Sequence, residues 1–294
     1  MSNSLLGIAL ALISTMSWAI CSILFKKLGE KLDAVSMATI KSTLSSVILF
    51  SIIIFTGNFL NISYDKLMPV ALSGIIGIAI GDSLFFSALN RLSPLMLSLI
   101  LLVCPDLFSG IFGFIFLKEM PSTLSWIGIF LILIGMMFIF KYEKDKSRNR
   151  TTFMGIFLAL LSLICTSYSM VLAKPVLVHI PVVVAVFYRM LFGAIFLLII
   201  GIFTGRIKIW KNNLNDIRFD MNLIGTIMLA TIGGFWMSLA AVKYCKLIIA
   251  SSLMMLEPLF ILIFMIIFNK YKPESKEILG VIIIVSGIIA LCFG

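Results

Sequence analysis

Five charged side chains lie inside long apolar stretches of the sequence, where an ionised group is unfavourable. They are Lys41, Asp82, Asp106, Arg189 and Glu257. A charge placed in hydrocarbon costs roughly 2.5–3.5 kcal/mol on insertion scales, so such residues usually persist because they serve a function. Carboxylates can carry protons or pair with cations, and lysine and arginine can hold anionic groups. The sequence therefore predicts a buried polar centre.

Asp106 and Glu257 are the strongest candidates for reversible chemistry. Each lies in the middle of its stretch beside a proline, Pro105 or Pro258, and a proline removes a backbone donor, which leaves a carbonyl open to water or a ligand. Burial favours the neutral form of a carboxyl group, so either side chain could take up a proton and release it on contact with water. The alternatives are permanently neutral structural groups, or carboxylates paired with a basic residue.

Asp82 and the two basic residues allow more than one interpretation. Asp82 follows Gly77 and Gly81, so it either takes part in substrate or proton binding or accepts hydrogen bonds from a neighbouring helix. Lys41 and Arg189 lie about seven residues into their stretches, roughly 10 Å at 1.5 Å per residue. This depth favours snorkelling toward the interface or gating through salt bridges. If they reach a cavity instead, they would bind a carboxylate or phosphate, and the arginine could do so bidentately.

Small polar and aromatic residues recur at helical spacing in both halves of the chain. Positions three, four and seven apart share one face of a helix, so two such stripes would form two walls of one pocket. Hydrogen bonding between helices without any ligand is the alternative. Trp236, which follows Gly233 and Gly234, would stack on a ligand or serve in packing. The stripe positions are Ser14, Trp18 and Cys21 in the first half, and Ser162, Thr166 and Ser169, with Tyr168 adjacent, in the second.

Apolar helices must position these residues. Of the 294 residues, 61% are hydrophobic and 12% are charged, which is more apolar than a soluble core of this length can use. A hydrocarbon core of about 30 Å requires about 17–25 apolar residues per helix. The sequence therefore predicts an all-α integral membrane protein with ten transmembrane helices. The runs are residues 5–25, 35–55, 68–89, 94–117, 123–140, 153–173, 182–203, 223–242, 247–268 and 278–293.

The basic residues orient the chain in the bilayer. The net charge is +10, yet lysine and arginine stand mostly in short loops between the runs, which argues against nucleic acid as a partner. Sixteen lie in alternate loops, starting with the loop after the first run, and five lie in the other loops. The positive-inside rule then places both termini on the outer side. Lys26 and Lys27 directly follow the first run, which we interpret as a span and not a signal peptide.

An internal repeat divides the chain into two domains. The polar segment 141–152 is a basic linker between a first repeat, residues 1–140, and a second, residues 153–294. Landmarks recur in the same order in both repeats, with nearly constant separation. They are Lys26 and Lys41 against Lys174 and Arg189, and Lys118 and Pro121 against Lys270 and Pro273.

Five helices per repeat is an odd number, so the second repeat must enter the membrane from the opposite side. Inverted repeats place a site near the midplane and supply two near-equivalent packings, the basis of alternating access in many secondary transporters. The sequence therefore predicts a secondary transporter of a small polar or amphipathic molecule, with proton coupling through the carboxyl groups as a further expectation. We expect a monomeric transport unit, and an oligomer is also compatible with the sequence.

Catalysis and cofactor binding find little support. The single histidine, His179, lies beside Pro181, and the sequence contains no metal-ligating histidine pair or phosphate-binding glycine loop. Five cysteines without paired spacing predict neither disulfides nor a zinc site. We expect no cofactor and no metal. Two alternatives to transport stay open: a membrane enzyme that uses the same carboxyl groups on lipid-linked intermediates, and a membrane scaffold that transports nothing.

Several short motifs keep the order and spacing of a known family. They are Lys41 and Arg189 early in the second and seventh runs, Gly81-Asp82-x-x-Phe85, Pro105, Leu256-Glu257-Pro258, and Phe116-Leu117-Lys118-Glu119. Together they resemble the ten-helix EamA-like family of the drug/metabolite transporter superfamily, over essentially the whole chain. Lys118 stands where that family usually has glycine, and residues 269–271 lack its glutamate, so no role is carried over to Glu119.

The resemblance has implications for location and activity. It implies a carrier of the bacterial inner (cytoplasmic) membrane, often an exporter of amino acids or related small metabolites. It also implies a central cavity lined mainly by helices 1, 3, 4, 6, 8 and 9. The lipid bilayer and a small-molecule substrate are therefore the expected partners.

Overall fold

The computed structural model is helical throughout the part of the chain that it describes. That part comprises residues 2–57, 62–101, 124, 127–128, 130–131, 134–135, 149–177, 180–205, 221–244, 253–254 and 256–293. Within it, five helices are long and apolar enough to cross a membrane, and two shorter apolar helices occur. The predicted runs at 94–117 and 123–140 fall largely outside these residues, so the full count of ten helices stays a prediction.

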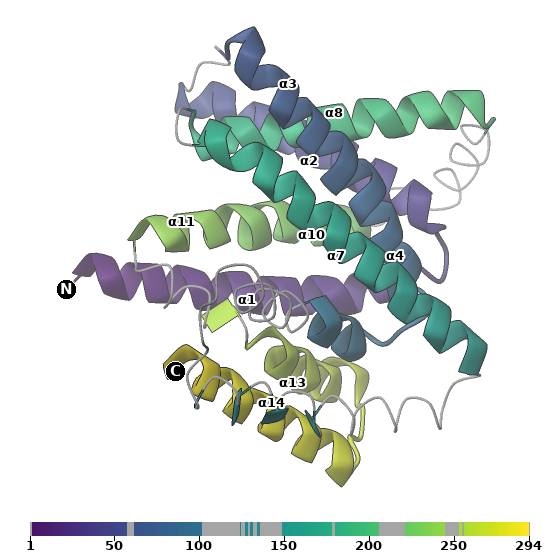
Figure 1. The fold of residues 1–294 in the computed structure, drawn as a ribbon. Coiled ribbons are helices and arrows are strands. Elements are labelled where there is room, and N and C mark those ends of the chain that lie inside the picture. The colour runs from purple at the N-terminus through teal and green to yellow at the C-terminus, as the bar shows by residue number, and fades with distance from the viewer. Residues whose placement is uncertain are drawn as a thin grey trace, which may run out of the picture. The chain divides into compact units, whose positions relative to one another are not determined.

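The helix bounds follow the predicted apolar runs closely where the two can be compared. The run predicted at 182–203 coincides with helix α8. The elements in chain order (Figure 1) are α1 (Ser2–Leu28), α2 (Ala34–Thr56), α3 (Tyr64–Ser73), η1 (Gly74–Gly81), α4 (Asp82–Leu89), α7 (Asn149–Leu177), α8 (Val182–Phe203), α10 (Met221–Met228), η3 (Leu229–Trp236), α11 (Met237–Tyr244), α13 (Glu257–Asn269) and α14 (Ser275–Phe293).

Local sequence signals explain where several helices begin and end. Asp33 caps α2, because its carboxylate accepts a hydrogen bond from the backbone N–H of Ser36. Gly57 ends α2 in the left-handed region at φ 65°, which glycine adopts without steric cost. Pro258 lies in the first turn of α13, where its missing N–H leaves no intrahelical bond unmade.

Two spans contain a π-helical segment between α-helical parts. The first is α3, η1 and α4 in succession, and the second is α10, η3 and α11. Each π-helical segment is eight residues long, and each lies in the third predicted apolar run of its half of the chain. π-helices are rare, usually limited to a single turn, and frequent at functional sites. Segments of this length therefore make both spans candidates for a functional role.

The described helices belong to two compact units, each built from segments of both halves of the sequence. One unit comprises 24–90 and 157–231. In it α2 packs against α8 and α4, and α8 packs against η1 and α3. Phe25 and Phe86 are among the largest fully buried side chains of the described residues, and their rings meet edge to face with centroids 5.1 Å apart.

The other unit comprises 1–23, 91–156 and 232–294. In it Ala11 of α1 and Ala241 of α11 are fully buried and pack with Leu10, Leu253 and Met254. The small alanine side chains allow these segments to approach closely.

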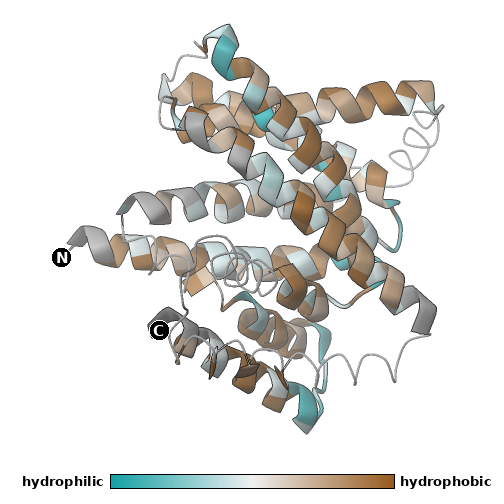
Figure 2. Ribbon diagram, in the orientation of Figure 1, coloured by the Kyte–Doolittle hydropathy of each residue, from teal (hydrophilic) through white to brown (hydrophobic). Residues whose placement is uncertain are grey.

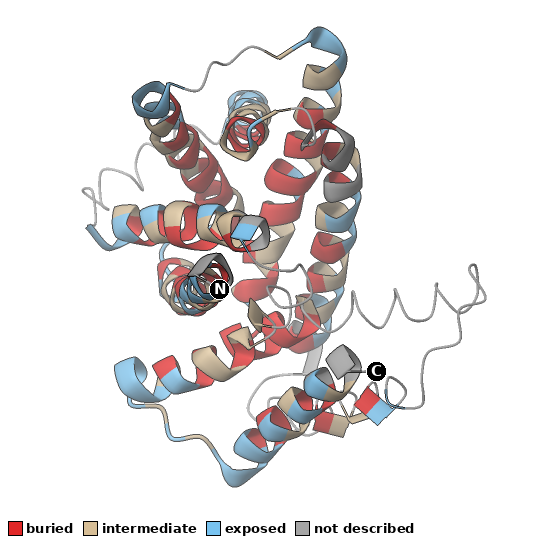
Figure 3. Cartoon of the chain, turned by 90° about the vertical axis from the view of Figure 1, so that its left-hand side faces the viewer, coloured by how far each residue is buried: buried red, intermediate tan, exposed pale blue. Residues whose placement is uncertain are grey.

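Large apolar side chains also cover the outward faces of the helices. Phe55 is 90% exposed and Phe203 is 86% exposed, and most of the α8 ribbon has the brown of hydrophobic residues (Figure 2). Individual helices carry a buried stripe next to exposed positions (Figure 3). In water such faces would be unfavourable, whereas in a bilayer lipid tails cover them. The pattern is that of helices packed on one side and open to lipid on the other.

Candidate functional site

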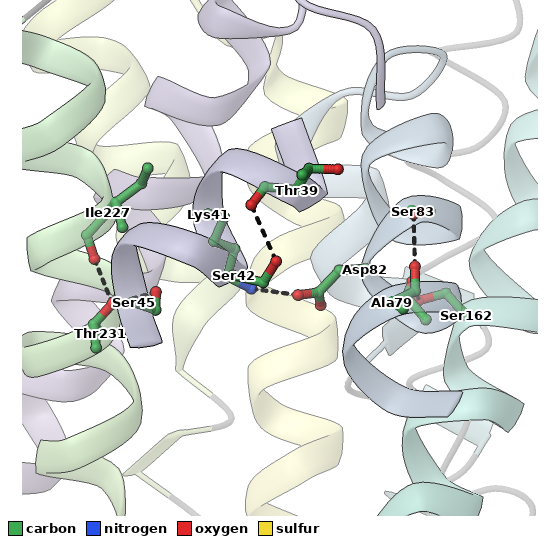
Figure 4. A network of polar contacts seen from close by, with 11 residues as sticks. Thr39, Lys41, Ser42, Ser45, Ala79, Asp82, Ser83, Ser162, Ile227 and Thr231 are labelled. Carbon is green, nitrogen blue, oxygen red and sulfur yellow. Dashed lines mark hydrogen bonds and ion pairs between the residues drawn. The ribbon is translucent and has the colours of Figure 1, made fainter. Parts of the chain in front are cut away.

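A buried ion pair joins α2 to the span that contains η1. The Lys41 Nζ lies 2.8 Å from Asp82 Oδ2, and the two residues are 3% and 8% exposed. Lys41 lies in the second turn of α2, and Asp82 is the first residue of α4, directly after η1 (Figure 4). The Phe86 ring lies 5.7 Å from the ammonium group, within range of a cation–π contact. Each charge is thus compensated inside the protein.

In this geometry the Lys41 side chain contacts a carboxylate of the protein, and its role in gating or anion binding stays a prediction. The ammonium group turns inward onto a carboxylate, and its low exposure is incompatible with snorkelling to the interface in this conformation. Asp82 accepts this bond from a neighbouring helix. Spacing in the sequence could not reveal the pair, because its members are 41 positions apart.

Arg189 contacts the second-half stripe. Its Nη2 donates to Ser169 Oγ of α7 at 3.1 Å. Gly77 of η1 lies against both groups, because a methyl group there would collide with the Ser169 side chain and come within 3.4 Å of the Arg189 Nη2. Gly74 lies against the Arg189 backbone in the same way. The glycines of η1 therefore let α7 and α8 approach this segment closely around a cation.

The other stripe residues of α7 serve packing in this conformation. Ser162 donates to the Gly81 carbonyl at 2.9 Å, at the end of η1. Thr166 donates to carbonyls of its own helix, while its methyl group lies next to Gly81. Tyr168 is 54% exposed, on a different face from buried Ser162. The structure thus brings Ser162 and Thr166 together beside η1 and leaves Tyr168 apart from them.

The first-half stripe on α1 faces η3. Ser14 Oγ donates to the Gly234 carbonyl at 2.9 Å. The Trp18 indole packs directly on Gly234, where an added methyl group would lie 2.8 Å from the ring. Trp18 also meets Phe235 edge to face, with ring centroids 4.8 Å apart. Trp236, the neighbour in sequence, is 41% exposed. Glycine at 234 is what permits the contact between an aromatic ring and the backbone.

Glu257 of α13 lies next to the same face of α1, where it contacts Ser22, one helical turn beyond Trp18. Ser22 Oγ is 3.4 Å from Glu257 Oε1, longer than a strong O–H···O bond. Ser14, Trp18 and Ser22 are spaced by four, so they form one stripe. The predicted stripe ended at Cys21 and did not include Ser22, although the spacing of four residues from Trp18 would have placed Ser22 on the same face. Asp106 lies outside the described residues.

The α1 stripe and Glu257 form an arrangement that can exchange partners. A carboxylate held by one long hydrogen bond can accept another donor at little cost. Aromatic rings and hydroxyl groups along the same stripe present surfaces suited to a cation or to a polar molecule with an apolar part. Among the described residues, no group of three or more His, Cys, Asp or Glu side chains could hold a metal ion. These groups are suited to reversible binding.

Comparisons with known proteins show where this chain has relatives. The model of the EamA-like transporter family matches residues 5–141 and 153–293. A protein of Bacillus subtilis strain 168 described as an uncharacterized transporter, YvbV, is 29% identical over 146 residues, which cover 49% of this chain and 47% of that protein. An uncharacterized transporter of Clostridium kluyveri is 25% identical over 150 residues, covering 50% and 47%. These matches span about half the length of each relative.

The fold also has a counterpart among solved structures. A crystal structure of a protein superposes with a TM-score of 0.59 at 14% identity, and the match covers 99% of this chain and 98% of that one. At this identity the likeness concerns the fold alone.

Proposed function

Because the chain belongs to the EamA-like transporter family, we propose that it is a secondary exporter of small metabolites that carry an amine, such as amino acids and related compounds. The protein is a multi-pass membrane transporter in contact with the lipid bilayer. Substrate class, direction and coupling are the parts that we propose. The observation that supports them is the carboxylate of Glu257 at the end of the α1 stripe.

Alternating access between two packings is the proposed mode of transport. Each half of the chain carries a π-helical segment in its third predicted apolar run, which supports two copies of one ancestral repeat. If each repeat has five helices, the copies are inverted and supply two near-equivalent conformations. The driving force would then be an ion or substrate gradient, because the sequence contains no nucleotide-binding loop.

Glu257 is the proposed exchange site for substrate and proton. In its ionised form the carboxylate would pair with the ammonium group of the substrate, and Trp18 and Phe235 would cover the apolar part. In its protonated form it would no longer attract the cation, which favours release. Asp106 is proposed as a second carboxyl group of the same kind, on the basis of sequence alone. Competition between proton and amine would couple export to proton entry.

The proposed setting is the inner (cytoplasmic) membrane, with both termini outside. The support is the excess of basic residues in alternate loops, sixteen against five. A monomeric transport unit is proposed, because two repeats in one chain suffice to form two sides of a pathway.

Metabolite analysis of the medium tests this function. Cells producing the wild type, Glu257→Gln or Glu274→Gln at equal abundance would be compared with cells lacking the protein. Glu274 is exposed, which makes it the matched control. We expect an amine-bearing metabolite to accumulate with the wild type and the control, and at least about tenfold less with Glu257→Gln, since a charge-assisted bond contributes about 1.5–3 kcal/mol.

Two results would contradict the proposal in different ways. If no metabolite distinguishes wild-type cells from cells lacking the protein, the exporter assignment fails. If Glu257→Gln exports as well as the wild type, transport stands but Glu257 is not its exchange site.

A further inference from the structure

One face of α2 contacts both spans that contain a π-helical segment. Lys41 Nζ bonds to Asp82 Oδ2 at 2.8 Å, and one turn later Ser45 Oγ lies 2.8 Å from Thr231 Oγ1. Asp82 directly follows η1, and Thr231 is the third residue of η3. Figure 4 shows α2 between the two partners, with Thr231 on one side and Asp82 on the other. Residues four apart on a single helix thus hold two matching elements.

A second hydrogen bond of Thr231 decides which of the two hydroxyl groups is the donor in the Ser45 contact. The Thr231 hydroxyl donates to the Ile227 carbonyl at 2.7 Å. Because a hydroxyl has a single hydrogen, Thr231 must accept from Ser45. Neighbouring Ser42 and Ser46 donate to carbonyls of α2 itself. Ser45 instead donates its hydrogen bond to another helix, as Lys41 forms its ion pair with another helix.

Burial makes both contacts strong constraints. Ser45 is 0% and Thr231 is 1% exposed, and Lys41 is 3% exposed. Water therefore does not compete for these groups, and a change of position on either side breaks a bond that no solvent molecule replaces. Movement of either span therefore either breaks a buried bond or shifts α2 with it.

A π-helical segment can change the orientation of the residues that follow it. A π-helical turn closes over one residue more than an α-helical turn, so converting one such turn to α-helix would rotate the following residues relative to the preceding ones by up to about 100°. At η1 this rotation would carry Asp82 away from Lys41. On its glycine side, η1 is held by close contacts of Gly74 with Arg189 and of Gly77 with Ser169. These contacts leave the segment little room on that side.

From these observations we propose that α2 is a coupling element, in which Lys41 and Ser45 are positioning residues that link η1 to η3. A change of helical form in η1 alters the Lys41–Asp82 pair, shifts α2, and reaches η3 through Ser45 and Thr231. Three residues further along η3, the Gly234 carbonyl accepts a hydrogen bond from Ser14. The inference rests on the proposed alternating access, because coupling has a purpose only if both repeats move together.

Hydrogen exchange of the purified protein in lipid nanodiscs tests the coupling without any substrate. The perturbation is the neutral pair Lys41→Gln with Asp82→Asn, which removes both charges and keeps hydrogen-bonding groups. The readout is exchange of the amides in residues 229–236, measured by mass spectrometry. We expect about 2- to 10-fold faster exchange there, as loss of one net hydrogen bond predicts.

The matched backgrounds are Ser45→Ala and Ser51→Ala. Ser51 is an exposed serine of α2 that donates to the carbonyl of Val47 in the same helix. In the Ser45→Ala background the charge change should no longer affect η3, whereas in the Ser51→Ala background it should act as in the wild type. Ser45→Ala leaves the Thr231 donor satisfied by Ile227, so the variant is expected to fold. Thr231→Val removes the same link from the other side and must give the same result.

The possible outcomes separate this proposal from the proposed function. Unchanged exchange in η3, or an equal change with and without Ser45, would overturn the coupling. Loss of export in Glu257→Gln with intact coupling would leave the inference standing. If no exported metabolite were found, the proposed function would fail, whereas the coupling measured by hydrogen exchange would stand.

Discussion

Replacement of Asp82 by asparagine is predicted to be strongly destabilising, because it leaves a buried lysine without its counter-ion. Lys41 is 3% exposed and its Nζ lies 2.8 Å from the carboxylate. Breaking a buried pair by removing one partner costs about 3–5 kcal/mol. The Phe86 ring at 5.7 Å stays in place and offsets up to about 2 kcal/mol of that loss. We therefore expect Asp82→Asn to lower the free energy of unfolding by about 1–5 kcal/mol.

The assay is a thermodynamic cycle on the protein in mixed micelles, with unfolding followed by circular dichroism during denaturant titration. The variants are Lys41→Gln, Asp82→Asn and both together. The double variant should be less destabilised than Asp82→Asn alone, because no unpaired charge stays inside. Asp65→Asn is the control, since Asp65 is exposed at the start of α3, and it should change stability by no more than about 0.5 kcal/mol.

Additivity is the result that would refute this reasoning. If the two single changes sum to the double within about 0.5 kcal/mol, the residues do not interact. The ion pair would then not hold α2 to α4, and the coupling proposed for α2 would lose its first link. A double variant that is more destabilised than Asp82→Asn would lead to the same conclusion.

Two further predictions concern packing and capping. Gly74→Ala would drive a methyl group into the Arg189 backbone, so we expect a loss of about 1–3 kcal/mol in stability; Gly225→Ala meets nothing within 4 Å and should be neutral or stabilising by up to about 1 kcal/mol in the same titration. The Lys26 ammonium donates to the Leu89 carbonyl at 2.7 Å, so Lys26→Met should cost about 1.5–3 kcal/mol and speed amide exchange in the last turn of α4, and unchanged exchange there would contradict a capping role.

Several parts of the candidate site could be anticipated from the sequence. A stripe at Ser14 and Trp18 follows from helical spacing, and the structure places both residues on one partner, Gly234. A lone carboxylate in an apolar run singles out Glu257, but its contact with Ser22 did not emerge, because Cys21 fitted the same periodicity. Neighbours on one helix are fixed by the 3.6-residue turn. Contacts with another helix also depend on how that helix is rotated and shifted.

The π-helical segments show a different limit. The sequence of η1, Gly74 to Gly81, is rich in glycine and isoleucine and reads as an ordinary apolar run. Glycine contacts with Arg189 and Ser169 hold the segment in its place. The form of the helix thus depends on neighbours that are more than 90 positions away in the chain, beyond the reach of local propensity.

The sequence by itself determined that the chain is a helical membrane protein with charges to be compensated, because apolar length and the cost of a charge in hydrocarbon depend on composition alone. It also carried the motifs of the EamA-like family. Only the tertiary structure decided which group each charge contacts: Lys41 pairs with Asp82, and Arg189 donates a hydrogen bond to Ser169. The physical reason is that compensation requires contact within about 4 Å, and the rotation and packing of whole helices set that distance.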